Sequence, residues 1–272
     1  MMDKKDRMTE IHPTAIVDAN AEIGQGVKIG PFCIIGKNVR IGDGTRLDPH
    51  VIIESNTTIG SDCTVQSGAV LGGAPQDYKF KGEDTYLRIG NNNIIRECVT
   101  LHRASGEGNA TTIGDNNMLM AYCHVGHNCT LGSCITMANN VGISGHVVVE
   151  DKVVFGGIVG VHQNVRIGKL AMVGGFSKIL QDVPPFSMVE GRPTRVYDLN
   201  KIGLRRNGVG PQSRAGLRLA YKLLYRSNLN TSQALEAIER EVEPSPELEY
   251  LVQFIKNIRG GYAGRQQEAP RF

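Results

Sequence analysis

The segment AYCHVGHNCTLG, residues 121–132, places two histidines three positions apart beside two cysteines, in a chain with only seven histidines. A neutral imidazole can accept a proton near neutral pH, a thiolate can act as a nucleophile, and both can bind zinc. His124 and His127 are therefore candidates for a general base or a metal ligand, and Cys123 and Cys129 for a nucleophile or a metal ligand. The choice depends on which of these side chains the fold turns outward.

The surrounding sequence has a six-residue period. Aliphatic residues recur at every sixth position from Ile11 to Leu71, from Ile89 to Leu101 and again up to Ile179, and glycine often follows directly. This period fits neither a helix of 3.6 residues per turn nor a two-sided strand. It is typical of short strands joined by tight turns, with one residue in each six pointing into a narrow interior. Such coils bury their apolar column only against neighbouring coils, so the sequence predicts a parallel β-helix.

Two gaps interrupt the period. If the frame continued through them, it would place Asp77, Glu83 and Glu107 in the apolar interior without partners. We therefore predict that 72–88 and 102–112 are loops that leave the column. Loops of this length on a compact repeat structure usually carry function.

The frame ends after Ile179, where Pro184 and Pro185 interrupt it. We predict two domains, a β-helix domain over 1–194 and a helical domain over 195–272.

The second domain is predicted to hold amphipathic helices and a loose tail. In its last helix Ser245 is the N-cap, Pro246 is the first residue, and Gly260 ends the helix. The predicted segments are 211–227, 232–242, 245–260 and, for the tail, 264–272.

The frame separates the cysteines from the histidines. Cys123 and Cys129 fall at a second, smaller inward position, so we interpret them as wall residues and not as nucleophiles. The histidines avoid the inward positions and are predicted to face outward. Because the steps from His124 to His146 and from His146 to His162 each approximate one coil, we expect these rings to stack along one edge of the column.

Two kinds of chemistry remain for this histidine stripe. Zinc would need three or four ligands at about 2.0–2.1 Å, and no set of acids stands nearby to orient the rings, so we expect no metal. A general base needs only one neutral imidazole, and one of these rings could take a proton from a sugar hydroxyl. Gly145, in ISGH, could direct a backbone N–H at a developing oxyanion.

Composition excludes several classes of protein. A net charge of +3 is too small to indicate nucleic-acid binding. We expect no transmembrane segment, because no run approaches about 18 apolar residues, and the start lacks an apolar signal region, so a soluble cytoplasmic protein with reduced thiols is predicted. The glycine-rich stretches follow the six-residue frame and precede no helix, so they are not phosphate loops and no cofactor is expected.

Several motifs together resemble one family, the bacterial acyl-carrier-protein–UDP-N-acetylglucosamine O-acyltransferases, or LpxA family. The likeness covers nearly the whole chain. It rests on IHPTAIVDANAEIGQGVKIGPFCIIG, PQDYKFKGE, IRECVTLHR, HVGHNCTLG, ANNVGISGHV, VHQNVRIG, QDVPPF, LNKIGLRR and AYKLLYRS. Hexapeptide repeats alone occur in many acetyltransferases, whereas the loop, histidine and helix motifs together are specific.

The resemblance implies a mainly β fold, a left-handed parallel β-helix of hexapeptide repeats with a C-terminal α-helical cap, assembled as a homotrimer with active sites between subunits. It implies transfer of an (R)-3-hydroxyacyl group from acyl carrier protein to the 3-hydroxyl of UDP-N-acetylglucosamine, the first step of lipid A biosynthesis. The family's base matches His127, which would activate the hydroxyl for direct attack on the thioester, and its oxyanion donor matches Gly145.

The resemblance also assigns substrate-binding roles. Gly175 matches a position that limits acyl length and, having no side chain, would permit a long chain. The residues matched to sugar, diphosphate, nucleotide or acyl contacts are Gln76, Asp77, Lys79, His124, His146, His162, Gln163, Asn200 and Arg206.

The chain departs from the family pattern at two of these places. Asn128 follows the base where aspartate is common; its amide can fix the ring's tautomer but cannot offset imidazolium charge, so another acid would have to substitute or activity should be lower. Asn207 stands where a second arginine is common, and Arg205 could take over its phosphate contact.

The cap carries a basic face, which is either a solvated surface or a docking site for the acidic acyl carrier protein. It comprises Arg205, Arg206, Arg214, Arg218, Lys222 and Arg226.

Other functions compete with this interpretation. The acceptor could be the 3-amino analogue of the sugar, and the sequence does not fix acyl length. The related N-acyltransferase of the later step usually has an extra domain before its β-helix, for which a repeat beginning at Ile11 leaves no room. A metal-dependent β-helix hydratase of the γ-carbonic-anhydrase type and a non-catalytic scaffold are the candidates from other classes.

Overall fold

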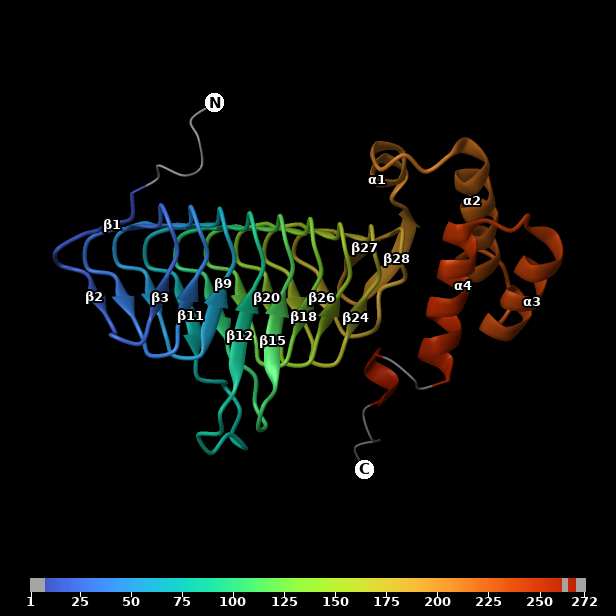
Figure 1. Cartoon of the computed structure of the whole chain (residues 1–272). Coiled ribbons are helices and arrows are strands. Elements are labelled where there is room, and N and C mark those ends of the chain that lie inside the picture. The colour runs from blue at the N-terminus through green and yellow to red at the C-terminus, as the bar shows by residue number, and fades with distance from the viewer. Residues whose placement is uncertain (1–7, 261–263, 268–272) are drawn as a thin grey trace.

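The computed structural model describes residues 8–260 and 264–267. The chain winds as a three-sided column of short strands that ends against a group of helices (Figure 1). Within the column each strand pairs in parallel with a strand of the next coil, commonly three hexapeptides further along the chain, as in Lys28 with Arg46 and Ile29 with Leu47. The prediction of a left-handed parallel β-helix with a helical cap is confirmed.

The strands form one sheet on each side of the column, which we name A, B and C. Sheet A holds β1 Glu10–Ile11, β4 Lys28–Ile29, β7 Arg46–Leu47, β10 Thr64–Val65, β13 Ile94–Ile95, β16 Met118–Leu119, β19 Thr136–Met137, β22 Val154–Phe155, β25 Met172–Val173, β27 Ser187–Gly191 and β28 Thr194–Leu199. Sheet B holds β2 Ile16–Val17, β5 Ile34–Ile35, β8 Ile52–Ile53, β11 Val70–Gly73, β14 Thr100–His102, β17 His124–Val125, β20 Gly142–Ile143, β23 Gly160–Val161 and β26 Lys178–Ile179. Sheet C holds β3 Glu22–Ile23, β6 Arg40–Ile41, β9 Thr57–Ile59, β12 Tyr86–Ile89, β15 Ala110–Ile113, β18 Thr130–Leu131, β21 Val148–Val149 and β24 Arg166–Ile167.

The inward residues of the repeat form a single apolar column. Ile53, Val65 and Leu119 are fully enclosed, as are the smaller second-position residues. Cys123 and Cys129 are buried free thiols, as predicted for wall residues. Burial raises the pKa of the Cys123 thiol to about 11 and that of Cys129 to about 12, which removes both as nucleophiles near neutral pH.

The corners of the column turn through residues with a left-handed backbone. Non-glycine residues occupy many of these corners, with φ of 58° at Asn128, 59° at His146 and 54° at Asp62. Asparagine and aspartate tolerate this conformation better than most side chains. The corner at 128 therefore suits Asn as well as the Asp that the resemblance led us to expect.

The two loops are shorter than 72–88 and 102–112. Strand β12 begins at Tyr86 and β15 at Ala110, and these two strands pair with each other along four residues. Leu87 and Thr111 are buried, because each stands two residues before an inward isoleucine, Ile89 or Ile113, at the second inward position of the repeat. The loops proper are 74–85 and 103–109, and they project from one side of the column (Figure 1).

The six-residue frame ends after Ile179, but the column continues beyond it. Strand β27 continues sheet A, with Val189 opposite Val173, and Val183 forms a bridge with Ile167. The partners in each pair are closer in sequence than three hexapeptides, because the turn with the two prolines shortens this coil by two residues. The shortened coil hides the repeat in the sequence. Strand β28 then pairs antiparallel with β27. The sequence reasoning missed this hairpin, which crosses the expected boundary at 194/195.

Four helices follow the hairpin. In α4, Ser245 caps the first turn by accepting from the Leu248 N–H, Pro246 begins the helix and Gly260 follows its end, as predicted. Apolar side chains from all four helices share one core, which includes Leu204, Leu217 and Leu251. The helices are α1 Lys201–Arg206, α2 Pro211–Tyr225, α3 Thr231–Glu241 and α4 Pro246–Arg259.

Helix α4 fixes the cap to the column. The Tyr250 hydroxyl donates to Glu150 at 2.6 Å, and the Arg166 guanidinium lies 4.5 Å from the ring centre of Phe254. The tail predicted to be loose forms a short 3₁₀ turn, η2 (Gly264–Gln267), beside the last coils; residues 268–272 lie outside the described residues. In the part of the chain that the structure describes, no helix has the length and apolarity to cross a membrane.

Candidate active site

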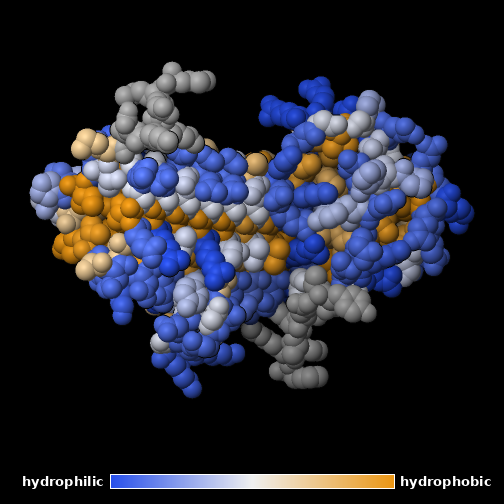
Figure 2. Space-filling model, in the orientation of Figure 1, coloured by the Kyte–Doolittle hydropathy of each residue, from blue (hydrophilic) through white to orange (hydrophobic). Residues whose placement is uncertain are grey.

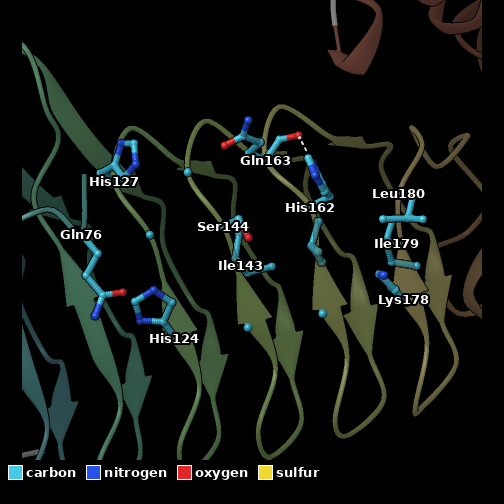
Figure 3. Close-up of a pocket in the computed structure, with 15 residues that line it drawn as sticks. Gln76, His124, His127, Ile143, Ser144, His162, Gln163, Lys178, Ile179 and Leu180 are labelled. Atoms are coloured by element: carbon cyan, nitrogen blue, oxygen red, sulfur yellow. Dashed lines mark hydrogen bonds between the residues drawn. The ribbon is translucent and has the colours of Figure 1, made fainter. Parts of the chain in front are cut away.

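A pocket of about 530 Å³ lies on the outer face of sheet B, near its corner with sheet C (Figure 3). Histidines stand toward one end and a lysine at the other. Its lining residues are Gln76, His124, Gly126, His127, Gly142, Ile143, Ser144, Gly145, Gly160, Val161, His162, Gln163, Lys178, Ile179 and Leu180.

Two glycines form the floor of this pocket. His124, Gly142, Gly160 and Lys178 occupy equivalent positions on four successive strands of sheet B. A Cβ added at either glycine would meet no atom within 4 Å. The missing side chains therefore leave an open trough between the imidazole of His124 and the ammonium of Lys178.

His127 stands at the corner that follows β17, half-buried. Its Nδ1 lies 2.9 Å from Oδ1 of Asn128. Ser105 fixes the orientation of that amide, because its backbone N–H donates to Asn128 Oδ1 at 2.9 Å and its carbonyl accepts from Asn128 Nδ2 at 3.0 Å. Since Oδ1 can only accept, Nδ1 of His127 carries the proton and Nε2 is left to accept one.

The reactive side of the His127 ring faces Gly145. A Cβ at Gly145 would lie 2.6 Å from Nε2, so only glycine leaves the ring in this position. Among the described residues, no acceptor takes a hydrogen bond from the Gly145 N–H. A proton acceptor and an available backbone donor therefore adjoin in the same pocket.

His146 supports the other side of His127. The two rings meet edge to face with centres 5.1 Å apart. Burial is the main cause that lowers the pKa of His146, and the neighbouring His127 adds to it. His146 contacts the base without lining the pocket.

His124 is held by groups from the preceding coil. Its Nδ1 lies 2.8 Å from the Thr100 hydroxyl, and its ring meets that of His102 at 5.0 Å between centres. Burial lowers the pKa of His124 to about 4, with a smaller effect from His102, so the ring is neutral at physiological pH. A neutral ring here can donate or accept a hydrogen bond without repelling a cation.

The predicted stacking of the histidines is wrong in its phase. His124 is in register with Gly142 and not with His146, which occupies a corner. His162 directly follows an inward residue, at yet another point of the coil. The rings differ in phase because neither the step from His124 to His146 nor the step on to His162 is a whole coil, although His124, His127 and His162 still line one pocket.

The first loop brings an acid toward His127. Gln76 lines the pocket, while Asp77 accepts from the Ser105 hydroxyl at 3.1 Å and from the Lys79 backbone N–H at 3.0 Å. The Lys79 N–H, followed by the Ser105 hydroxyl, lowers the pKa of Asp77 below its ordinary value. The side chain of Lys79 is exposed beside them.

His162 and Gln163 lie farther along the trough, toward Lys178 (Figure 3). Nδ1 of His162 lies 3.2 Å from the Gln163 carbonyl and is also within hydrogen-bond distance of the Arg265 guanidinium. A guanidinium only donates, so in the contact with Arg265 the ring carries its proton on Nε2. The backbone N–H of Arg265 donates to the half-buried Asp182, which holds the η2 turn in place.

Four predicted site residues lie neither in this pocket nor beside His127. Asn200 caps α1, accepting from the Gly203 N–H and donating to the Leu170 carbonyl, both at 2.9 Å. Arg205 and Arg206 are exposed in the last turn of α1. Gly175 is exposed at a corner, where a Cβ would lie 3.2 Å from the Gly157 carbonyl oxygen.

Sequence reasoning missed Ser105, Lys178 and Arg265. Lys178 could have been found, since it stands three full coils after His124 in the repeat frame. Ser105 lies in a loop that was expected to carry function, but nothing in the sequence shows which loop residue reaches the base. Arg265 reaches His162 only through the packing of the cap on the column.

The donor set does not form a metal centre. No group of three or more His, Cys, Asp or Glu side chains within 8–260 and 264–267 is arranged to hold a metal ion.

Comparison with known proteins gives a consistent result along the chain. Residues 182–263 match the model of "UDP N-acetylglucosamine O-acyltransferase; domain 2", residues 110–145 match six bacterial transferase hexapeptide repeats, and residues 10–75 match the GMPPB C-terminal domain model. The acyl-[acyl-carrier-protein]–UDP-N-acetylglucosamine O-acyltransferase of Alkalilimnicola ehrlichii is 50% identical over 249 residues, covering 91% of this chain and 96% of that protein. The enzyme of the same name from Thermodesulfovibrio yellowstonii is 49% identical over 93% of this chain and 99% of its own length.

Solved structures agree. LpxA from Acinetobacter baumannii superimposes with a TM-score of 0.87 at 44% identity, covering 91% of this chain and 96% of its own. LpxA from Bacteroides fragilis, a UDP-N-acetylglucosamine acyltransferase, superimposes with a TM-score of 0.89 at 39% identity, covering 91% and 97%.

Proposed function

This chain belongs to the family of acyl-[acyl-carrier-protein]–UDP-N-acetylglucosamine O-acyltransferases, and we propose that the pocket between His124 and Lys178 is where it performs that reaction. The protein is an acyltransferase. The donor is an acyl carrier protein thioester and the acceptor is UDP-N-acetylglucosamine. We further propose that the group transferred is an (R)-3-hydroxyacyl chain, that it goes to the 3-hydroxyl, and that this is the first step of lipid A biosynthesis.

His127 is the proposed general base. Its Nε2 takes the proton of the sugar 3-hydroxyl as that oxygen attacks the thioester carbonyl. The oxyanion of the tetrahedral intermediate accepts from the Gly145 N–H. When the intermediate collapses, the carbon–sulfur bond breaks, and the departing thiolate of the carrier takes the proton from His127.

One observation carries this assignment. The amide of Asn128, itself oriented by the Ser105 backbone, allows the His127 Nδ1 only to donate. This leaves Nε2 as the proton acceptor, beside the N–H that would stabilise the oxyanion. A structural histidine would need neither the fixed tautomer nor the neighbouring glycine.

The two ends of the trough are proposed to contact different parts of the substrates. Gln76 and His124 are proposed to contact the sugar near the base, and His162, Gln163 and Lys178 the more distant parts of the substrates. A pocket of about 530 Å³ holds part of such substrates and not all of them. Asp77, Lys79 and His146 border the base from the other side and keep their proposed substrate roles.

We propose that the chain assembles as a homotrimer, which would give the remaining predicted residues their roles. Gly175, Asn200, Arg205 and Arg206 lie outside the pocket of one protomer, so their proposed contacts with acyl chain and nucleotide would need clefts between neighbouring copies. The face of the column seen in Figure 2 carries an apolar band. On sheet B, the in-register isoleucines Ile16 and Ile34 are exposed. Bands of this kind favour burial in an assembly.

The test of the base is His127→Ala. We expect acyl transfer to fall by 10²-fold or more (roughly 10²–10⁴-fold for a lost general base), with the melting temperature near that of the wild type because the ring is outside the column. His50→Ala is the matched control, since His50 is also a corner histidine but stacks on Phe32 far from the pocket. His124→Ala should be milder than His127→Ala. Full activity of His127→Ala, measured by mass spectrometry of the acylated sugar nucleotide, would refute this base.

A further inference from the structure

The hydroxyl of Ser105 lies among three groups of the proposed site. Its Oγ is 3.1 Å from Asp77 Oδ2, 3.1 Å from Asn128 Oδ1 and 3.4 Å from His127 Nδ1. A serine hydroxyl has one proton to donate and two lone pairs with which to accept. It can therefore accept from the ring and donate to the carboxylate at the same time.

The position of Ser105 is fixed by its own backbone. Its N–H and carbonyl both bond to the Asn128 side chain, and the carbonyl also accepts from Asn109 Nδ2 at 3.0 Å. The residue is half-buried in the 103–109 loop. This network holds the hydroxyl at the ring and gives it little freedom to turn away.

The base needs a negative charge that its direct partner does not supply. When Nε2 takes a proton, His127 becomes an imidazolium, and the neutral amide of Asn128 does not offset that charge. An opposite charge within reach of the ring favours the charged form. Asp77 is the ionised group that the structure places beyond the Ser105 hydroxyl, with its pKa lowered by the Lys79 N–H and by that hydroxyl.

We propose that Ser105 is a positioning residue that connects the Asp77 carboxylate to the His127 base, in place of an acid bonded directly to the ring. The inference rests on the function proposed above. As Nε2 gains its proton, Nδ1–H shares its hydrogen bond with Ser105 Oγ while Oγ–H donates to Asp77. No proton leaves the ring through this route; the hydrogen-bonded chain only strengthens as charge develops.

The prediction concerns the pH dependence of the rate. Without the link the imidazolium that forms during the reaction is less stable. Ser105→Ala should lower kcat by about tenfold, leave KM within about twofold, and move the acid limb of the kcat/KM profile to lower pH by roughly half a unit or more. Ser105→Thr keeps the hydroxyl and should retain most of the rate and the wild-type limb.

A second substitution gives a rescue. Asn128→Asp in the Ser105→Ala background places a carboxylate directly on Nδ1, and aspartate is compatible with the left-handed corner, as Asp62 shows. The double variant should recover much of kcat and return the acid limb to higher pH. Ser133→Ala is the control for loss of a corner hydroxyl, because Ser133 Oγ accepts from the Asp115 N–H on another part of the column.

The outcomes separate this inference from the proposed function. An active His127→Ala would remove the base itself. An inactive His127→Ala combined with a wild-type profile for Ser105→Ala, or with a loss that Asn128→Asp does not restore, would overturn the link alone. If Ser105→Ala melts well below the wild type, Asp77→Asn in the wild-type and Ser105→Thr backgrounds decides: the link requires the same shift of the acid limb in both.

Discussion

Each histidine near the trough has a distinct environment, and burial decides which of them can carry charge. Burial lowers the pKa of His102, His124 and His146, so these rings are neutral at physiological pH. His127 is distinguished by its partners: a fixed acceptor on Nδ1 and a glycine beside Nε2. The neighbours can then shape and contact the substrate without competing for its proton.

The lowered pKa of His124 makes stability depend on pH. Its folded pKa of about 4 lies below the ordinary value of 6.5, so the unfolded chain binds the proton first as the pH falls. The free energy of unfolding is therefore highest above the unfolded pKa and decreases as the pH falls from there toward the folded pKa. Between about pH 7 and pH 5 the free energy of unfolding of His124→Gln should decrease by about 1 kcal/mol less than that of the wild type.

Urea unfolding at the two pH values, at constant ionic strength, measures this difference. The control is His12→Gln, at the exposed start of the column. Its free energy of unfolding should decrease between the two pH values as much as that of the wild type. An unchanged pH dependence in His124→Gln would mean that the ring is not held neutral by the fold.

The repeat frame predicted which residues face inward, but not which outward residues meet. Cys123 and Cys129 were placed correctly because their spacing from the inward aliphatics is local. The contacts of Ser105, by contrast, depend on where a loop outside the frame returns to the column. Such a contact has no periodic signal.

At the scale of the elements, strands β17, β20, β23 and β26 together build the trough. Its depth depends on residues that have no side chain, Gly142 and Gly160, flanked in register by His124 and Lys178. Glycine weakens a strand interior, so these positions trade stability for space.

Gly142→Val tests this trade. A Cβ there meets nothing within 4 Å, and valine suits a strand, so the melting temperature should stay the same or rise. The side chain would fill the trough beside His124, and we expect kcat/KM to fall by about tenfold, chiefly through KM, because a branched side chain displaces bound substrate. Thr130→Val, on the exposed face of sheet C, controls for the added branched residue. Unchanged kinetics would place the substrate elsewhere.

The elements that sequence reasoning missed are those that break the period. The coil closed by Pro184 and Pro185 is two residues short, which hid β27, and the hairpin with β28 pairs against the direction of the column. The helix bounds in the cap were predictable because Ser245, Pro246 and Gly260 are local signals. The contact of η2 with His162 was not, because it joins residues about a hundred positions apart.

At the scale of the whole molecule, charge is distributed unevenly although the net value is only +3. The basic residues of the predicted face belong to α1, α2 and the residue that follows α2, at one end of the column (Figure 1), and an apolar band extends along the column (Figure 2). Arg218 is exposed on α2 beside Lys201 and Arg214. Such a face would attract an acidic carrier and orient its thioester toward the column.

Arg218→Glu tests this docking. Reversing the charge should raise KM for the acyl carrier protein severalfold at low salt, and less at high salt because the attraction is screened. KM for UDP-N-acetylglucosamine should not change. Lys37→Glu, an equal charge reversal near the opposite end of the column, should leave both constants as they are. Equal effects of the two variants, or no effect of salt, would exclude docking through this face.

The free thiols inside the column have one more consequence. Cys33 and Cys63 are buried in different coils, Cys123 and Cys129 are buried together in a third coil, and Cys98 and Cys134 are open to solvent. An alkylating reagent would reach the buried four only where neighbouring turns separate. The order in which these buried cysteines become reactive would therefore report the order in which the coils of the stack separate.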